Sequence, residues 1–197
     1  MRKIIFATSN EGKMREIREI LKGLDIELLS MKDAGLSLDI EENGETFEEN
    51  AVIKARAVME LTHEIVLADD SGLEVDYMNK APGVYSARFM GENTSYEVKN
   101  QYILDQLLGA KDHERSARFV CVIACAFPDG QVITSRGTIE GVIAREISGA
   151  NGFGYDPIFY VPEYECTTAQ MSSELKNKIS HRGKALNAMK EAIKEYL

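Results

Sequence analysis

Two adjacent carboxylates interrupt an apolar stretch near the middle of the chain, Val66–Val75 (VLADDSGLEV). Apolar residues precede the acids, and Leu73 and Val75 restart an alternating pattern after them, so the acids are expected where a β-strand ends or bends. Adjacent carboxylates repel each other, and a hard cation such as Mg²⁺ between them and a ligand would relieve that repulsion. An ordinary Asp-Asp-Ser-Gly turn explains the same residues equally well. The stretch therefore predicts either a turn or the edge of a site.

The composition is that of a soluble globular protein. A chain of 197 residues, 44% hydrophobic and 28% charged, is expected to form one domain over residues 1–197 with a core that needs no disulfide. A net charge of -9 argues against non-specific binding to long nucleic acid, because that binding neutralises phosphates with Lys and Arg. Three cysteines, no membrane-length apolar run and no signal-peptide core together predict a cytoplasmic protein.

The first elements predict a strand, a polar turn and a helix. Lys3–Ala7 is the expected strand, and the apolar residues of the helix have helical spacing: Met14, Ile17, Ile20, Leu21 and Leu24. The turn between them, Thr8–Lys13 (TSNEGK), has the geometry that binds phosphate, because helix N–H groups, Gly12 and the charge of Lys13 all face it. A plain helix cap at Thr8, Ser9 or Asn10 is the alternative.

An acidic segment, Asp39–Glu49, precedes the next predicted helix. Thr46 and Glu49 form a capping box, which explains the acids at the helix start but neither Glu41 nor Glu42. Lys54 falls on the apolar side of this helix, with Phe47, Ala51, Ala55 and Val58. Its side chain either extends past the core to solvent or meets an anion, for which a ligand phosphate would serve.

The second half predicts a helix, a hairpin and a glycine-rich loop. The helix covers about Ser95 to Leu108, and strands over Ala117–Phe127 and Gln131–Ile139 are joined by the Asp129-Gly130 turn. In the loop Gly149–Pro157, glycines allow close approach of a ligand, an aromatic ring can stack on a base, and Asp156 can accept a hydrogen bond. A turn whose aromatic residues cover the core edge is the alternative.

The last helix begins with positive charge. Lys176–Lys184 precedes its apolar face, Ser180 is the expected N-cap, and His181 and Arg182 fall in the first turn, where their charge opposes the helix dipole. An anion nearby would offset that charge, and a solvated basic surface is the alternative. The apolar face consists of Leu186, Met189, Ile193 and Tyr196.

Five motifs together resemble the inosine triphosphate pyrophosphatase family, which acts on non-standard purine nucleoside triphosphates. They occur in order over nearly the whole chain: Thr8–Lys13, Gly44–Phe47 and Glu49–Ala51 with Lys54, Ala68–Leu73, Phe153–Pro157, and Ser180–Gly183. The resemblance implies an elongated α/β fold with a long central mixed β-sheet flanked by helices, two lobes with a substrate cleft between them, and a homodimer. It implies hydrolysis of dITP, ITP and XTP to the monophosphate and pyrophosphate.

The resemblance also implies roles for single residues. Glu41 and Asp70 would hold Mg²⁺, and Asp70 would accept a proton from the attacking water. Phe153 would stack on the purine, and Asp156, His181 and Arg182 would address the base. The full set of expected substrate-binding residues is Thr8, Ser9, Asn10, Glu11, Gly12, Lys13, Lys54, Ser71, Phe153, Gly154, Tyr155, Asp156, Lys176, His181 and Arg182.

Other functions remain open at this stage. A nucleotide-binding sensor would keep such a pocket without turnover, although the Asp69-Asp70 pair and Glu41 argue against it. A related pyrophosphatase for modified pyrimidine nucleotides is a second alternative. One position departs from the resemblance, since Gln170 stands where the family often has an acid after Thr-Ala. The partner expected from all of this is a small purine nucleoside triphosphate, with no nucleic acid and no membrane.

Overall fold

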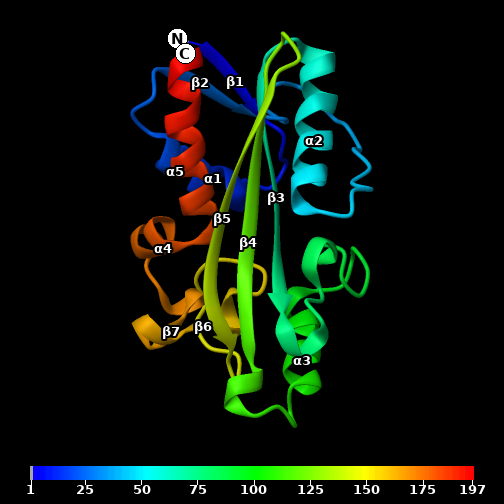
Figure 1. Ribbon diagram of the computed structural model, residues 1–197, viewed down its shortest axis with the longest axis vertical. Coiled ribbons are helices and arrows are strands. Elements are labelled where there is room, and N and C mark those ends of the chain that lie inside the picture. Colours follow the sequence, from blue (N-terminus) through cyan, green and yellow to red (C-terminus); the bar gives the residue numbers. More distant parts are fainter. Residues whose placement is uncertain (1) are drawn as a thin grey trace. The chain divides into compact units, whose positions relative to one another are not determined.

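A computed structural model of the chain describes residues 2–197. The structure contains both helices and strands (Figure 1). The helices are α1 (Glu11–Leu21), α2 (Phe47–Thr62), α3 (Tyr96–Gln106), α4 (Ser173–Ile179) and α5 (His181–Ile193). The strands are β1 (Arg2–Phe6), β2 (Ile26–Ser30), β3 (Ile65–Val75), β4 (Ser116–Ala126), β5 (Val132–Ile143), β6 (Phe159–Val161) and β7 (Cys166–Thr167).

The strands form one mixed sheet in the order β2-β1-β3-β4-β5-β6-β7. β1 pairs in parallel with both β2 and β3, whereas β6 pairs antiparallel with both β5 and β7. Parallel neighbours need a long crossover, and α1 supplies the one between β1 and β2. The predicted α/β class with a mixed sheet and flanking helices is confirmed.

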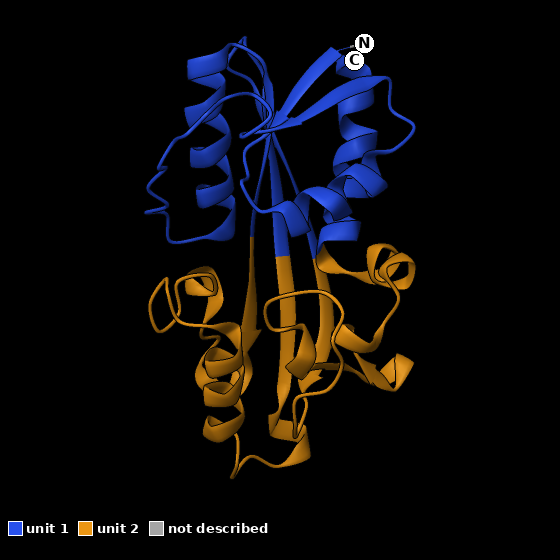
Figure 2. Ribbon diagram, turned by 180° about the vertical axis from the view of Figure 1, so that it is seen from behind, with its two compact units in different colours: residues 1–70, 121–137, 182–197 blue, residues 71–120, 138–181 orange. Residues whose placement is uncertain are grey.

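The chain divides into two compact units (Figure 2). Unit 1 consists of residues 1–70, 121–137 and 182–197, and unit 2 of residues 71–120 and 138–181. The division falls inside β3, β4 and β5, so each of these strands contributes to both units. Each unit has its own cluster of buried apolar side chains. The expectation of one domain over residues 1–197 stays a prediction.

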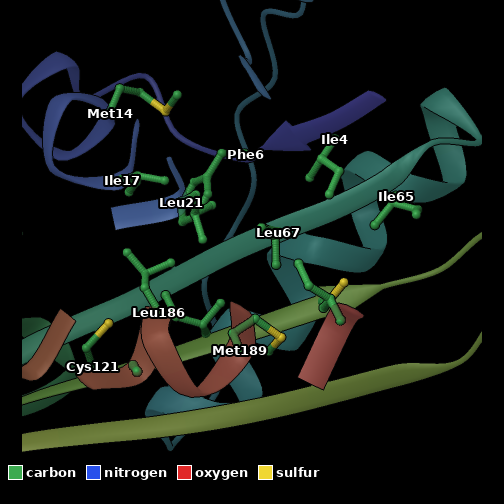
Figure 3. Packing of buried hydrophobic residues seen from close by; sticks show 14 of the residues in the cluster. Ile4, Phe6, Met14, Ile17, Leu21, Ile65, Leu67, Cys121, Leu186 and Met189 are labelled. Carbon is green, nitrogen blue, oxygen red and sulfur yellow. The ribbon is translucent and has the colours of Figure 1, made fainter. Parts of the chain in front are cut away.

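The core of unit 1 packs two helices against the parallel strands (Figure 3). Met14 and Ile17 of α1 and Leu186 and Met189 of α5 are fully buried, as their helical spacing predicts. Phe6 and other strand residues complete the cluster, which also contains the buried thiols Cys121 and Cys125. These two cysteines are therefore part of the core. The apolar face of α1, which follows the predicted phosphate-binding turn, is thus buried in this core.

The core of unit 2 lies around α3 and the parts of β3, β4 and β5 that belong to unit 2. Ile103, Leu104 and Leu107 pack with Phe119 of β4 and Phe159 of β6, whose ring centroids lie 4.4 Å apart. Tyr155 from the glycine-rich loop belongs to the same cluster and is 4% exposed. One aromatic residue of that loop therefore covers the core, as the structural alternative predicts.

The predicted interruption at the acidic pair is wrong. β3 runs without a break from Ile65 to Val75, through Asp69, Asp70, Ser71 and Gly72. Residue types typical of turns are extended here because cationic side chains from other elements compensate the buried acids, as described below. The other boundaries agree closely with the sequence: β4 and the start of β5 are as expected, and Gly130, at φ +89°, closes the turn between them.

Helix starts follow the capping residues. The side chain of Asn10 caps α1, Ser95 caps α3, and Thr46 forms the predicted capping box with Glu49 at α2. Arg182 lies in the first turn of α5, as expected. The segment before it is partly helical, however, because α4 covers Ser173–Ile179 with Ser172 as its cap. Within residues 2–197, no helix has the length and apolar character needed to cross a membrane.

Candidate active site

The predicted phosphate-binding turn is a capped helix start. The Asn10 amide oxygen accepts a hydrogen bond from the Lys13 N–H at 3.0 Å, and the Thr8 hydroxyl accepts one from the Asn10 N–H at 3.2 Å. The capping alternative is therefore confirmed. Capping and anion binding are compatible, because one side chain satisfies only one of the N–H groups that a helix start leaves without a helical partner.

Asp69 joins three cations of unit 1. Its Oδ2 lies 2.8 Å from the Lys13 ammonium and 3.6 Å from the Arg182 guanidinium, and its main-chain oxygen accepts a hydrogen bond from Lys54 at 2.9 Å. Only 1% of Asp69 is exposed. Burial by itself would raise the pKa of Asp69. The positive charges of Lys13, Arg182 and Lys54 outweigh that effect and hold the pKa of Asp69 well below its usual range. Asp69 therefore carries a buried negative charge.

Arg182 has anionic partners within the chain itself. Its guanidinium donates to the carboxylate of Glu16 on α1 and also lies beside Asp69. The positive charge that opposes the dipole of α5 is thus offset by two acids of unit 1 rather than by solvent. The solvated-surface alternative is wrong for Arg182, which is 2% exposed.

Asp70 has a pKa near neutral pH. Burial raises the pKa of Asp70 to about 7, and the neighbouring carboxylates of Glu42 and Asp69 act in the same direction. The Lys54 charge and the Asn50 amide oppose these effects. A carboxyl group poised near neutrality is suited to accepting a proton in a reaction.

Lys54 does not extend into solvent. Its side chain is 13% exposed, and its ammonium lies 2.8 Å from the carboxylate of Glu42. The second alternative, an anionic partner, is confirmed, and the anion present is a carboxylate of the chain. Glu42 is therefore the acid of the 39–49 segment that acts on Asp70, whereas Glu41 is exposed. The role of Glu41 as a magnesium ligand stays a prediction.

The acidic groups of unit 1 fit Mg²⁺ in their chemistry. Asp70 is buried next to the like charge of Glu42, a repulsion that a divalent cation would relieve, and Mg²⁺ takes one or two carboxylates together with water and substrate phosphates. Within residues 2–197, no three acidic, histidine or cysteine side chains gather as a ready-made metal site.

In unit 2, Asp156 organises the glycine-rich loop. Its Oδ2 accepts hydrogen bonds from the Phe153 N–H at 2.9 Å and from the Lys176 ammonium at 2.7 Å, while its Oδ1 accepts one from the Thr168 hydroxyl at 2.8 Å. Both charged side chains are nearly fully buried. Asp156 thus fixes the backbone of the loop and one lysine at the same time.

Phe153 and Lys176 lie together. The Lys176 ammonium is 4.7 Å from the centroid of the Phe153 ring, a cation–π distance. Gly152, at φ +73°, allows this packing, because a Cβ there would lie 2.1 Å from Oδ2 of Asp156. The predicted residues Phe153, Asp156 and Lys176 are therefore brought together, and an aromatic ring is held beside a positive charge.

Helix α3 supports the same loop. Asn100 donates a hydrogen bond to the carbonyl of Gly154 at 3.1 Å, and Tyr96 packs edge-to-face on Tyr155 with ring centroids 5.2 Å apart. A pocket of about 220 Å³ lies beside the loop, and its lining includes Tyr96, Asn100, Phe153 and Gly154. Tyr155 donates its hydroxyl hydrogen to the carbonyl of Ser86, so it is a structural member of the loop.

The remaining expected residues divide between the units. Ser71 is the first residue of unit 2 and is partly buried in β3. His181 is buried in unit 2, where its ring stacks on Phe119 with centroids 4.8 Å apart. Sequence reasoning missed Glu16, Asn50 and Thr168, which act on expected site residues. Asn50 lies inside the motif Glu49–Ala51, although no role was expected for it. No local pattern marks Glu16 or Thr168, because their partners belong to other elements.

Comparison with known proteins identifies a family. A sequence profile of the Ham1 family matches residues 4–192. The chain is 47% identical over 203 residues to a dITP/XTP pyrophosphatase of Clostridium perfringens, covering 100% of both chains. It is 50% identical over 191 residues to one of Desulforamulus reducens, covering 97% of this chain and 95% of the relative.

Solved structures agree with this result. A HAM1 protein from Coxiella burnetii superposes with a TM-score of 0.90 at 44% identity, covering 99% of this chain and all of that one. The Staphylococcus aureus Ham1 protein has a TM-score of 0.88 at 41% identity, with full coverage of both chains.

Proposed function

Because this chain belongs to the Ham1 family, we propose that it hydrolyses non-standard purine nucleoside triphosphates to the nucleoside monophosphate and pyrophosphate. The observation that carries the proposal is the sequence identity of 47% and 50%, over almost the whole chain, to relatives named dITP/XTP pyrophosphatase. The expected substrates are dITP, ITP and XTP, and their hydrolysis would remove them from the nucleotide pool. Each unit contains described residues whose chemistry suits such a reaction.

The triphosphate is assigned to unit 1. The start of α1, from Thr8 to Lys13, offers backbone N–H groups and an ammonium, and Lys54 adds further positive charge. Lys176, which belongs to unit 2 and pairs there with Asp156, is the second lysine proposed to add charge for the triphosphate. The attacking water would lose its proton to the carboxylate of Asp70 as its oxygen bonds to phosphorus, while the bond to the departing pyrophosphate breaks.

The charge balance of unit 1 supports a requirement for Mg²⁺. Lys13, Lys54 and Arg182 already pair with carboxylates of the chain: Glu16, Glu42 and Asp69. With Asp70 also ionised, acids outnumber bases in this group of contacts, so a highly charged triphosphate would be repelled without a cation. Glu41 and Asp70 are the proposed ligands of Mg²⁺, which when bound neutralises phosphate charge and lowers the pKa of water.

The base is assigned to unit 2. Phe153 offers a ring for stacking, and Asp156 holds that loop in place through the Phe153 N–H. His181 and Arg182 are proposed to address the polar edge of the base. Donors aimed at a 6-keto oxygen would meet the amino group of adenine instead, and a polar group left unpaired costs about 1–3 kcal/mol.

One assay tests the proposal. Hydrolysis of ITP, XTP, dITP, GTP and ATP is measured with and without Mg²⁺, and the products are separated. Release of pyrophosphate and monophosphate from the first three substrates, only with Mg²⁺, is the expected result. Successive release of orthophosphate would contradict it. Tight ITP binding without hydrolysis would favour a nucleotide sensor, and preference for pyrimidine triphosphates would favour a pyrimidine pyrophosphatase.

The assembly and location are also proposed. We infer a homodimer that acts in the cytoplasm on a small-molecule substrate and binds no nucleic acid. The net charge of -9 supports the last point, because binding to long nucleic acid depends on basic residues. Light scattering coupled to size exclusion gives the mass in solution, and a mass of one 22.0 kDa chain would contradict the dimer.

A further inference from the structure

Asp69 connects cationic side chains from three helices, and two of them, Lys13 and Lys54, are assigned to the triphosphate. Its side chain contacts Lys13 of α1 and Arg182 of α5, and its main-chain oxygen accepts a hydrogen bond from Lys54 of α2. We infer that Asp69 is a positioning residue that fixes the ammonium of Lys13 for the triphosphate. The inference rests on the proposed function, because it takes the phosphate-binding role of Lys13 from there.

A structural role alone explains Asp69 poorly. The neighbouring strand residues Val66, Leu67 and Ala68 are fully buried and apolar, so an apolar side chain would suit this interior better than a carboxylate. A buried ion pair is weak support for stability, because the cost of removing two charges from water offsets their attraction. What the acid provides is a fixed anchor point for cations. Those cations are the residues assigned to the ligand.

The geometry leaves Lys13 able to bind a second partner. An ammonium has three N–H donors, and one Asp69 oxygen at 2.8 Å takes one of them. The Lys13 side chain is 21% exposed, against 1% for that of Asp69, so its outer side is open to solvent and to a ligand. A lysine free in water loses rotamer freedom when it binds phosphate, and an anchored lysine has already lost it.

A second contact fixes the same face of α1. Glu16 lies one turn after Lys13, on the same side of the helix, and accepts a hydrogen bond from Arg182. Arg182 in turn lies beside Asp69. The helix that carries the phosphate-binding turn is therefore attached to β3 directly through Lys13 and indirectly through Glu16 and Arg182. Loss of Asp69 would release the first attachment and weaken the second.

A positioning role makes turnover and binding respond differently. Asp69→Asn keeps the shape of the side chain but removes one negative charge near the phosphate groups. Affinity for inorganic tripolyphosphate, measured by calorimetry, is therefore expected to stay within about threefold or to increase, because the added electrostatic attraction offsets the rotamer entropy that an unanchored Lys13 loses on binding. The kcat for ITP is expected to fall at least about 30-fold, because displacing a reacting or binding group by about 1 Å lowers the rate on the order of 100-fold. Loss of both properties together would overturn the inference.

A double-mutant cycle tests whether Asp69 acts through Lys13. The kcat/KM for ITP is measured for Asp69→Asn, Lys13→Gln and the double variant. If Asp69 acts by positioning Lys13, the double variant is at most about threefold less active than Lys13→Gln alone. Losses that multiply would overturn the inference. Asp76→Asn is the matched control, since Asp76 also pairs with an arginine, Arg118, in unit 2, and it should leave kcat and KM unchanged.

Nuclear magnetic resonance of lysine ammonium groups tests the contact without turnover. In the wild-type protein the ¹⁵N signal of the Lys13 ammonium is expected to show slow hydrogen exchange, and the signal is identified by its absence in Lys13→Gln. Failure to find a protected signal would overturn the inference even if ITP is hydrolysed. A protected signal in a protein that does not hydrolyse ITP would contradict the proposed function alone. The measurement also decides the question if Asp69→Asn fails to fold.

Discussion

The carboxylate of Glu42 lies 2.8 Å from the ammonium of Lys54, which places an acid from outside the helix against the middle of α2. The same ammonium donates a hydrogen bond to the main-chain oxygen of Asp69. The acidic segment before α2 is therefore attached to the helix and, through it, to β3. This attachment brings a second negative charge to Asp70 and explains part of its raised pKa, after the larger effect of burial.

Replacing Lys54 with methionine should lower activity strongly. The variant keeps the apolar stem of the side chain but leaves Glu42, Asp69 and Asp70 without a shared cation. We expect kcat/KM for ITP to fall about 100-fold and stability to fall by about 1–3 kcal/mol, the cost of leaving partly buried polar groups unpaired. Steady-state kinetics and urea denaturation measure the two effects. Arg56→Met, at an exposed position of the same helix, is the control and should change neither.

Paired substitutions should show which acid binds Mg²⁺. Glu42 already neutralises Lys54, whereas Glu41 is exposed, so Glu41→Gln is expected to raise the half-saturating Mg²⁺ concentration at least about tenfold. Glu42→Gln should leave that concentration within about threefold and lower Tm by about 2–4 °C, corresponding to the loss of about 1 kcal/mol. Titration of activity with Mg²⁺ and thermal denaturation give both values. The reverse pattern would assign the metal to Glu42.

Removal of the Phe153 ring should affect nucleotides and spare inorganic phosphates. Stacking of a base on an aromatic ring contributes about 1–3 kcal/mol, so KM for ITP should rise between about 10- and 100-fold in Phe153→Ala. Inhibition by tripolyphosphate, which lacks a base, should be unchanged. Tyr164→Ala is the control, because Tyr164 is an aromatic residue of unit 2 with a 37% exposed side chain. Equal weakening of ITP and tripolyphosphate would contradict the assigned role.

The ion pair of Asp76 and Arg118 should make stability depend on acid pH. Hydrogen bonds from Arg118 and then Ser116 lower the pKa of Asp76 below 3.8. A lowered pKa in the folded state stabilises the protein above pH 3.8, and this contribution disappears as the pH falls through the folded value. Because Asp76 is partly exposed, the contribution is about 1 kcal/mol or less. Urea denaturation of wild type and Asp76→Asn should differ at pH 7 and converge as the pH falls through the folded-state pKa of Asp76.

Much of the fold was predictable because its signals are local. The spacing of apolar residues and the capping side chains Asn10, Thr46 and Ser95 mark where α1, α2 and α3 begin. β3 was not predictable, because the preference of Asp-Asp-Ser-Gly for turns is overridden by contacts with residues distant in sequence. Strands β6 and β7 are only three and two residues long, too short to show alternation.

The candidate site was predictable in its residue types and less so in its contacts. Motifs identify Lys13, Lys54 and Arg182 as cations near a ligand, but their own carboxylate partners lie 15 or more residues away, with the exception of Lys54 and Glu42. Nothing in the sequence tells which acid meets which base. The expectation that an anion offsets the charge of Arg182 was sound, whereas the identity of that anion, Glu16, needed the folded chain.

The loop needs glycine at position 152, where the backbone carries only hydrogen in place of a side chain. Any larger side chain would occupy the space in which the oxygen of Asp156 meets Lys176, since a Cβ would lie 2.1 Å from that oxygen. Substitutions at residues 152 and 156 are therefore coupled. A variant in which Gly152 is replaced must also replace Asp156 or shift its carboxylate. Surveys of natural variants should find the two positions changing together or remaining as they are.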